Sequence, residues 1–162
     1  MTVVTTNRIL AEKLLQDSCG QNCVDWAIGM LGQGRDTHHV LRLAGMIPPH
    51  NHFEIAELRD KALRELEIPD ISVTEAITKF TVELLQAALC GETDMVAALA
   101  EVKELCIAND YQGDIMEFYH LYFALTDLQY SDVQWYWPGA TAENISAIIR
   151  ERATAFVESH ST

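Results

Sequence analysis

The sequence predicts an all-α protein, an irregular bundle of about eight helices that forms a single domain over residues 1–162. Apolar residues recur at helical spacing along most of the chain, and no segment shows a convincing strand-like alternation of apolar and polar residues. Capping residues, glycines and prolines interrupt this pattern at short intervals. No long linker rich in Pro, Gly or Ser divides the chain, so we expect one domain with short helix connections.

The first two helices are marked by apolar residues followed by glycines. We expect the first helix over Arg8–Asp17, with Gly20 just past its end. The second is expected to begin near Asn22, a favourable N-cap residue, and to end at Gly32 or Gly34.

The next two helices are separated by two prolines. A short helix is expected after an N-cap at Asp36 or Thr37, and Pro48–Pro49 should stop it. Asn51 should cap a longer helix that continues until Pro69. The residues expected on the inward face of this longer helix are Phe53, Ile55, Ala56, Leu58, Ala62, Leu63 and Leu66.

Capping signals place the fifth and sixth helices. Ser72 followed by Glu75 has the spacing of a capping box, in which each residue satisfies a backbone N–H group of the other. This long helix should end at Gly91, and Thr93 or Asp94 should cap the helix that follows.

The last two helices flank a segment rich in aromatic residues. We expect a helix over Asp114–Leu128, a non-helical loop over residues 129–140, and a final helix capped by Thr141 that frays from Ser159. A short extended piece at Val133–Trp137 is the one place where a strand is considered.

The chain is strongly acidic. Eleven Lys and Arg residues oppose 24 Asp and Glu residues, which gives a formal net charge of −13. Residues 82–162 hold 13 of the acidic residues and three basic ones, a net charge of −10. Such a surface repels phosphate backbones and anionic lipid, so we expect no nucleic-acid or membrane partner. It would attract a basic protein, although high charge also serves solubility.

A soluble, cytoplasmic protein is expected. The N-terminal residues lack a basic region followed by an apolar stretch, and no run approaches the ~18 apolar residues of a spanning helix. The cysteines, which are expected to be reduced thiols, are Cys19, Cys23, Cys90 and Cys106.

The familiar catalytic motifs are missing. No serine lies in a Gly-x-Ser-x-Gly turn, and the glycines of the GMLGQG segment come without the lysine of a phosphate-binding loop. We therefore predict no cofactor and no catalytic residue. Residues distant in the sequence could still form a catalytic group, so the sequence leaves open whether the protein is an enzyme.

A metal-binding bundle or metal-dependent enzyme is the alternative hypothesis. His50, His52 and Glu54 lie close enough in the sequence to share an ion, but a site needs three or four ligands. Glu117 and His120 form a Glu-x-x-His pair, which places both side chains on one helix face. A di-iron site requires a second such pair, and this chain has none, so no metal is predicted.

The aromatic segment before the last helix is the most informative part of the chain. Trp135, Tyr136 and Trp137 are consecutive, so they cannot all face one core. One interpretation turns Trp135 and Trp137 inward and leaves Tyr136 outside. The other is a partner-binding patch, because exposed Trp and Tyr are typical of protein interfaces.

Acidic residues lie close to this segment in the sequence. Asp127, Asp132 and Glu143 flank the three aromatic residues, and an acidic rim around an aromatic centre suits a partner that carries Arg and Lys. The helix before the loop is also aromatic, and we expect one of its aromatic residues to contact either the loop or a partner.

Several stretches resemble small, uncharacterised bacterial helical proteins. They are the Trp26–Thr37 segment, Val40–Gly45, Phe53-Glu54, Ala62–Leu66, Phe118-Tyr119 and the Trp-Tyr-Trp loop. The resemblance implies a helical fold and carries no activity or catalytic residue. In size and charge the chain is also similar to the immunity proteins that cover basic toxin surfaces.

These observations predict an acidic intracellular protein-binding module, with an immunity or inhibitor protein as the specific form. The metal-binding bundle is the alternative, and a homodimer closed by the aromatic loop is a further option.

Overall fold

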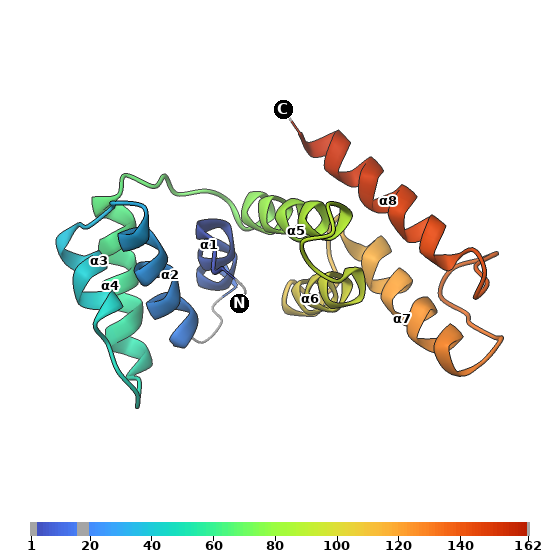
Figure 1. Ribbon diagram of the computed structural model, residues 1–162, viewed down its shortest axis with the longest axis horizontal. Coiled ribbons are helices and arrows are strands. Elements are labelled where there is room, and N and C mark those ends of the chain that lie inside the picture. The colour runs from blue at the N-terminus through green and yellow to red at the C-terminus, as the bar shows by residue number, and fades with distance from the viewer. Residues whose placement is uncertain (1–2, 16–19, 162) are drawn as a thin grey trace. The chain divides into compact units, whose positions relative to one another are not determined.

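The computed structural model describes residues 3–15 and 20–161, and these residues form eight α-helices and no strand (Figure 1). The predicted all-α class is confirmed. The helices are α1 (Thr6–Leu14), α2 (Gln21–Gly32), α3 (His38–Ala44), α4 (His52–Glu65), α5 (Val73–Leu89), α6 (Met95–Ala108), α7 (Met116–Tyr130) and α8 (Ile145–His160).

Contacts divide the chain into two compact units, residues 1–76 and residues 77–162, and the boundary falls inside α5. Each unit is described by itself below. The expectation of one domain over residues 1–162 stays a prediction. Within the described residues, no helix has the length and apolar character that crossing a membrane requires.

The first unit is built around α2. This helix packs against α1, α3 and α4, and α3 also packs against α4. Trp26 is fully buried, and its indole Nε1 donates a hydrogen bond of 3.0 Å to Thr6 Oγ1. The bond satisfies the one polar group of a large core side chain, which burial would otherwise penalise.

The first two helices begin earlier than predicted. Thr5 caps α1 by accepting a hydrogen bond from the Arg8 backbone N–H group. The N-cap of α2 is Gly20, whereas Asn22 lies inside the helix and donates to Glu12 Oε1 at 3.0 Å. The N-cap prediction for Asn22 is therefore wrong, because its side chain bonds a neighbouring helix. Asp17, the predicted end of the first helix, lies outside the described residues.

The predicted N-caps of α3 and α4 are confirmed in position. Thr37 is the N-cap residue of α3, and Asn51 Oδ1 accepts from two backbone N–H groups in the first turn of α4. However, α3 ends with Gly45 as its C-cap, before Pro48–Pro49 is reached. The prolines therefore do not themselves end this helix. α4 also stops at Glu65, short of Pro69.

Phe53 is 90% exposed, so its predicted place on the inward face of α4 is wrong. The buried positions of that helix include Ile55, Leu58 and Ala62, which follow one stripe. Each helical residue turns by about 100°, so a side chain two positions before Ile55 points away from the stripe.

Hydrogen bonds between His39, in the first turn of α3, and Glu65, the last residue of α4, join these two helices. The Glu65 carboxylate accepts from the His39 backbone N–H group and contacts His39 Nδ1, each at 2.8 Å. The hydrogen bond to the His39 side chain lowers the pKa of Glu65 to about 2, and the bond to the His39 backbone acts in the same direction. Glu65 thereby satisfies an N–H group at the start of α3.

In the second unit, α7 packs against both α6 and α8. Phe118 from α7 meets Phe156 from α8 edge to face, with ring centroids 5.4 Å apart. Arg150 Nη2 donates to the Leu89 carbonyl oxygen at 3.3 Å, which links α8 to the C-terminal end of α5.

The caps of the second half largely follow the sequence. Ser72 Oγ accepts from Glu75 N at 3.1 Å before α5, and Asp94 Oδ2 accepts from Ala97 N before α6. Gly91 follows α5 with a φ of +81°. α7 begins two residues later than predicted and ends two residues later, at Tyr130.

The last helix continues further than the sequence suggests. Ser159 and His160 are helical, and both side chains contact the Phe156 carbonyl oxygen. These contacts satisfy a carbonyl group near the helix end, so the predicted fraying from Ser159 is wrong up to His160.

The cysteines differ from the expected set of reduced thiols. Cys23 is disulfide-bonded, whereas Cys90 and Cys106 are free thiols. Burial raises the pKa of the Cys106 thiol to about 11, which keeps it protonated at neutral pH. Cys19 lies outside the described residues.

Candidate functional site

The aromatic loop, residues 131–140, is organised by the side chain of Gln134. Its Oε1 accepts from the backbone N–H groups of Tyr136 at 2.9 Å and Trp137 at 2.8 Å. Its Nε2 donates to the carbonyl oxygens of Trp137 and Ala140. One amide group therefore ties both halves of the loop together, which gives a definite shape to a segment without helix or strand.

A second clamp joins the loop to α8. The Thr141 N–H group donates to Asn144 Oδ1 at 2.6 Å, and the Asn144 N–H group donates to Thr141 Oγ1 at 3.3 Å. Asn144 Nδ2 also donates to the Gly139 carbonyl oxygen at 3.0 Å. Thr141 thus contributes near the start of α8 as predicted, although Asn144 is the N-cap residue.

The loop presents Trp135 to solvent. This side chain is 89% exposed, whereas Trp137 is half-buried and Tyr136 is 41% exposed. The interpretation in which Trp135 turns inward is therefore wrong. Period-two alternation requires an extended chain, and the hydrogen bonds of Gln134 fold this segment into turns. The short extended piece considered at Val133–Trp137 is not a strand.

Tyr136 lies against the side of α7. Its ring is 5.4 Å from that of Phe123 and 6.4 Å from that of His120, with tilts of about 30°. Phe123 in turn contacts Tyr119 at 4.9 Å. The expected contact between an aromatic residue of this helix and the loop is confirmed. The packing of Tyr136 on α7 stabilises the position of the loop.

Two further large apolar residues close to Trp135 in the sequence have exposed side chains. Tyr130, the last residue of α7, is 89% exposed, and Val133 is more than half exposed. The expected loop over residues 129–140 includes Tyr130, whereas the structure places this residue at the end of α7. Trp and Tyr are enriched among the residues that dominate protein interfaces, so this exposed segment is the candidate contact surface.

The three predicted acidic residues flank this loop along the chain. Asp132 and Glu143 are exposed, and Asp127 is half-buried near the end of α7. Among the described residues, none of the three forms an ion pair. Their negative charges are therefore not neutralised within the unit.

The second unit has few cations to offset its acids. Residues 77–162 contain 13 acidic and four basic residues, a net charge of −9. Lys103 pairs with Glu104 at 2.8 Å, and Arg152 pairs with Glu117 at 2.6 Å. These bonds raise the pKa of Lys103 and Arg152 and hold each cation on a local carboxylate.

The Glu-x-x-His pair of α7 does not form a metal site in this structure. Both Glu117 oxygens accept from Arg152, so the carboxylate is occupied by an ion pair. His120 instead lies among the aromatic rings of Tyr119 and Tyr136, and its Nδ1 has no hydrogen-bond partner among the described residues. Glu117 therefore contributes to the contact with α8, and His120 contributes to packing among aromatic rings.

The histidines around the start of α4, His50 and His52, also contact neighbouring residues. His50 Nε2 contacts Gln21 Oε1 at 2.8 Å, and the His52 ring lies 3.6 Å from the position that a Cβ on Gly20 would occupy. Glu54 is exposed in the first turn of α4. Over residues 3–15 and 20–161, no group of three His, Cys, Asp or Glu residues is close enough to hold a metal ion.

Sequence reasoning found the aromatic residues but missed what shapes the loop. Gln134 and Asn144 make seven of its hydrogen bonds, yet neither carries a motif that spacing alone reveals. The nearest signal is the preference of Thr and Asn for positions just before a helix.

Comparisons with known proteins find no relative of this chain. No protein-family model, no curated protein sequence and no solved structure matches it.

Proposed function

We propose that the chain is an acidic protein-binding module whose aromatic loop and flanking carboxylates bind a basic protein surface. The observation that carries the proposal is the exposure of Trp135 on a loop that Gln134 holds in shape. Holding the backbone that carries a large aromatic side chain in one shape before binding lowers the entropy that association costs. Trp is also enriched among the residues that dominate interface energies.

The acidic residues and the aromatic residues have different roles in this proposal. The net charge of −9 on residues 77–162 attracts a basic partner over a distance and speeds encounter. Trp135 and Tyr136, with Trp137 behind them, then supply the apolar contact that holds the complex. Asp127, Asp132 and Glu143 provide carboxylates for Arg and Lys side chains at the rim.

An immunity or inhibitor protein is the specific form that we propose. A chain of 162 residues with a net charge of −13 can cover a basic active-site surface and mask it. The proposed location is the cytoplasm, and the proposed source is bacterial, in line with the resemblance to small bacterial helical proteins. No nucleic acid and no membrane lipid is the proposed partner, since both carry negative charge.

The test is affinity capture from source-cell lysate with the wild-type chain and two variants, Trp135→Ala and Phe53→Ala. Phe53 is an equally exposed aromatic residue of the first unit, so it controls for nonspecific aromatic adsorption. We expect the wild type and Phe53→Ala to capture one basic protein at low salt. Trp135→Ala should lose it, with a loss of about 2 kcal/mol in binding free energy.

Retention of the same partner by Trp135→Ala would show that the proposed surface is wrong. Light scattering of the purified chain checks the homodimer option, since a dimer that Trp135→Ala dissociates would mean that a second copy covers the loop. A protein that binds at low salt and is released at high salt supports the acidic rim as part of the contact.

A further inference from the structure

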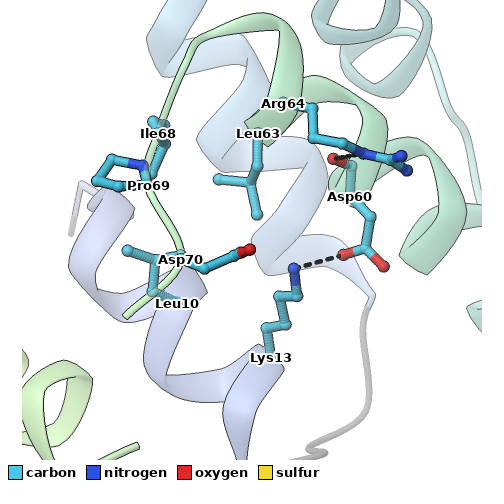
Figure 2. A pocket seen from close by; sticks show the side chains of 8 residues that line it. All are labelled: Leu10, Lys13, Asp60, Leu63, Arg64, Ile68, Pro69 and Asp70. Carbon is cyan, nitrogen blue, oxygen red and sulfur yellow. Dashed lines mark hydrogen bonds and ion pairs between the residues drawn. The ribbon is translucent and has the colours of Figure 1, made fainter. Parts of the chain in front are cut away.

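A cavity in the first unit is lined by both apolar and charged residues. Its volume is about 290 Å³, and it lies among α1, α4 and the segment that follows α4 (Figure 2). This volume is close to the lower limit of ordinary ligand pockets. The cavity belongs to residues 1–76 and shares no residue with the aromatic loop.

The apolar part of the cavity wall comes from Leu10, Leu63, Ile68 and Pro69. Leu10 and Leu63 are buried core residues of α1 and α4, so this part of the wall rests on packed structure. An aliphatic group that entered the cavity would meet these side chains and leave water, which favours binding.

The charged part of the wall holds two cations and two carboxylates. Lys13 Nζ lies 3.4 Å from Asp60 Oδ1, and the same oxygen accepts from Arg59 Nε at 3.0 Å. The second lining cation is Arg64, whose Nε donates to the Asp60 carbonyl oxygen, and the second lining carboxylate is Asp70. The distance of 3.4 Å exceeds that of a tight charge-assisted hydrogen bond, so Lys13 remains able to bind another acceptor.

Asp70 forms no hydrogen bond or ion pair with any other described residue. Figure 2 shows its carboxyl group and the Lys13 ammonium group directed toward the same space beside Leu63. An acceptor and a donor of opposite charge therefore lie beside an apolar wall.

We propose that this cavity binds a free aliphatic α-amino acid. Asp70 accepts from the ammonium group of the ligand, Lys13 donates to its carboxylate, and the apolar wall contacts its side chain. Lys13 and Arg64 disfavour a ligand that carries only a positive charge, and Asp60 and Asp70 disfavour one that carries only a negative charge. A zwitterion meets both charges with its opposite and adds an aliphatic group for the wall.

Calorimetric titration of the full chain with L-leucine tests the proposal, with L-leucine methyl ester and N-acetyl-L-leucine as controls. The ester lacks the carboxylate and the acetyl compound lacks the ammonium group. We expect saturable 1:1 binding of L-leucine below about 10 mM. Each control compound should bind about tenfold more weakly or worse, because each loses one charge-assisted pair.

Two variants locate the site. Asp70→Asn should weaken L-leucine about tenfold and remove its advantage over N-acetyl-L-leucine, whereas Asp36→Asn, an exposed carboxylate outside the cavity, should bind like wild type. Helical circular dichroism checks that both variants fold. No saturable binding up to about 10 mM, equal binding of the ester, or unchanged binding by Asp70→Asn would each overturn the proposal.

Discussion

Gln134 is a single half-buried side chain on which the shape of the aromatic loop depends. Its Oε1 accepts from two backbone N–H groups, and its Nε2 donates to two carbonyl oxygens. We expect Gln134→Ala to raise the amide hydrogen-exchange rates of Tyr136 and Trp137 at least about tenfold. The reason is that both N–H groups lose their acceptor.

Gln134→Glu is the matched comparison, because it keeps the accepting oxygen and removes the donor. At neutral pH the two amides should stay protected in this variant, while the unfolding free energy falls by about 1 to 2 kcal/mol from the lost donor bonds. Gln129→Ala, at an exposed position of α7, should change neither measurement. Equal exchange rates in Gln134→Ala and wild type would contradict the assigned role.

Glu65 is the second residue whose environment makes a measurable prediction. Its pKa is lowered from 4.5 to about 2, chiefly by the hydrogen bond to His39, so the folded state favours the ionised carboxylate. A depressed carboxyl pKa contributes stability above the unfolded-state value, and this contribution is lost as the pH falls through the folded-state value. The relevant window is therefore about pH 4.5 to about pH 2.

We expect Glu65→Gln to lower the free energy of unfolding by about 1 kcal/mol at pH 7, because the amide keeps an accepting oxygen but loses the charge that strengthens the bonds to His39. The difference from wild type should shrink as the pH falls from 4.5 toward 2, since protonated Glu65 resembles Gln. Urea unfolding at a series of pH values measures it. A difference that stays constant down to pH 2 would show that ionisation of Glu65 is not involved.

Helix ends show a regularity at the level of elements. The same pair of backbone hydrogen bonds ends four helices, α2, α4, α5 and α6. In each pair, the N–H group of the first residue past the C-cap donates to the carbonyl oxygen three residues earlier. The N–H group of the second residue past the C-cap donates to the carbonyl oxygen five residues earlier. The first residue past the C-cap has positive φ in each case: Gly34, Glu67, Gly91 and Asp110. Two of these four positions are therefore not glycine.

We expect substitution to have opposite effects on stability at the glycine positions and at the positions that are not glycine. Glu67 has a φ of +58°, which strains a side chain with a Cβ atom, so Glu67→Gly should raise the unfolding free energy by about 0.5 to 1 kcal/mol. Gly91→Ala should lower it by about 1 kcal/mol, although no atom lies within 4 Å of the added Cβ. Thermal or urea unfolding measures both. Similar signs for the two changes would mean that backbone strain does not decide them.

Charge acts on the whole molecule. If the acidic surface attracts the partner and Trp135 holds it, salt and substitution should affect different rate constants. We expect the association rate of the captured partner to fall about tenfold or more between about 20 mM and 500 mM salt. Trp135→Ala should instead raise the dissociation rate about 30-fold at constant salt.

Biosensor kinetics with the captured partner separates these effects, with Phe53→Ala as the variant that should match wild type in both rates. An association rate that does not respond to salt would contradict the proposed role of the acidic residues. If Trp135→Ala changed only the association rate, the proposed role of the aromatic contact would be contradicted.

Most of the helices could be predicted from the sequence, because their signals are local. Asn51, Ser72 and Asp94 cap helices by bonds that span two or three residues, and Gly34 and Gly91 relieve strain at a single φ. Apolar spacing of three and four residues likewise predicts the buried stripe wherever one helix face meets the core. These interactions depend on neighbours along the chain, so the sequence contains them directly.

The sequence by itself thus determined the helical class, most caps and the presence of an aromatic loop with acidic neighbours. Only the tertiary structure decided that Trp135 faces solvent, that Glu117 pairs with Arg152 35 residues away, and that Lys13 and Asp70 line one cavity. Those outcomes depend on how separate helices pack within each unit and on the particular turns that Gln134 makes. Neither follows from a period or a spacing, because contacts between distant residues and one particular set of side-chain hydrogen bonds fix where each side chain points.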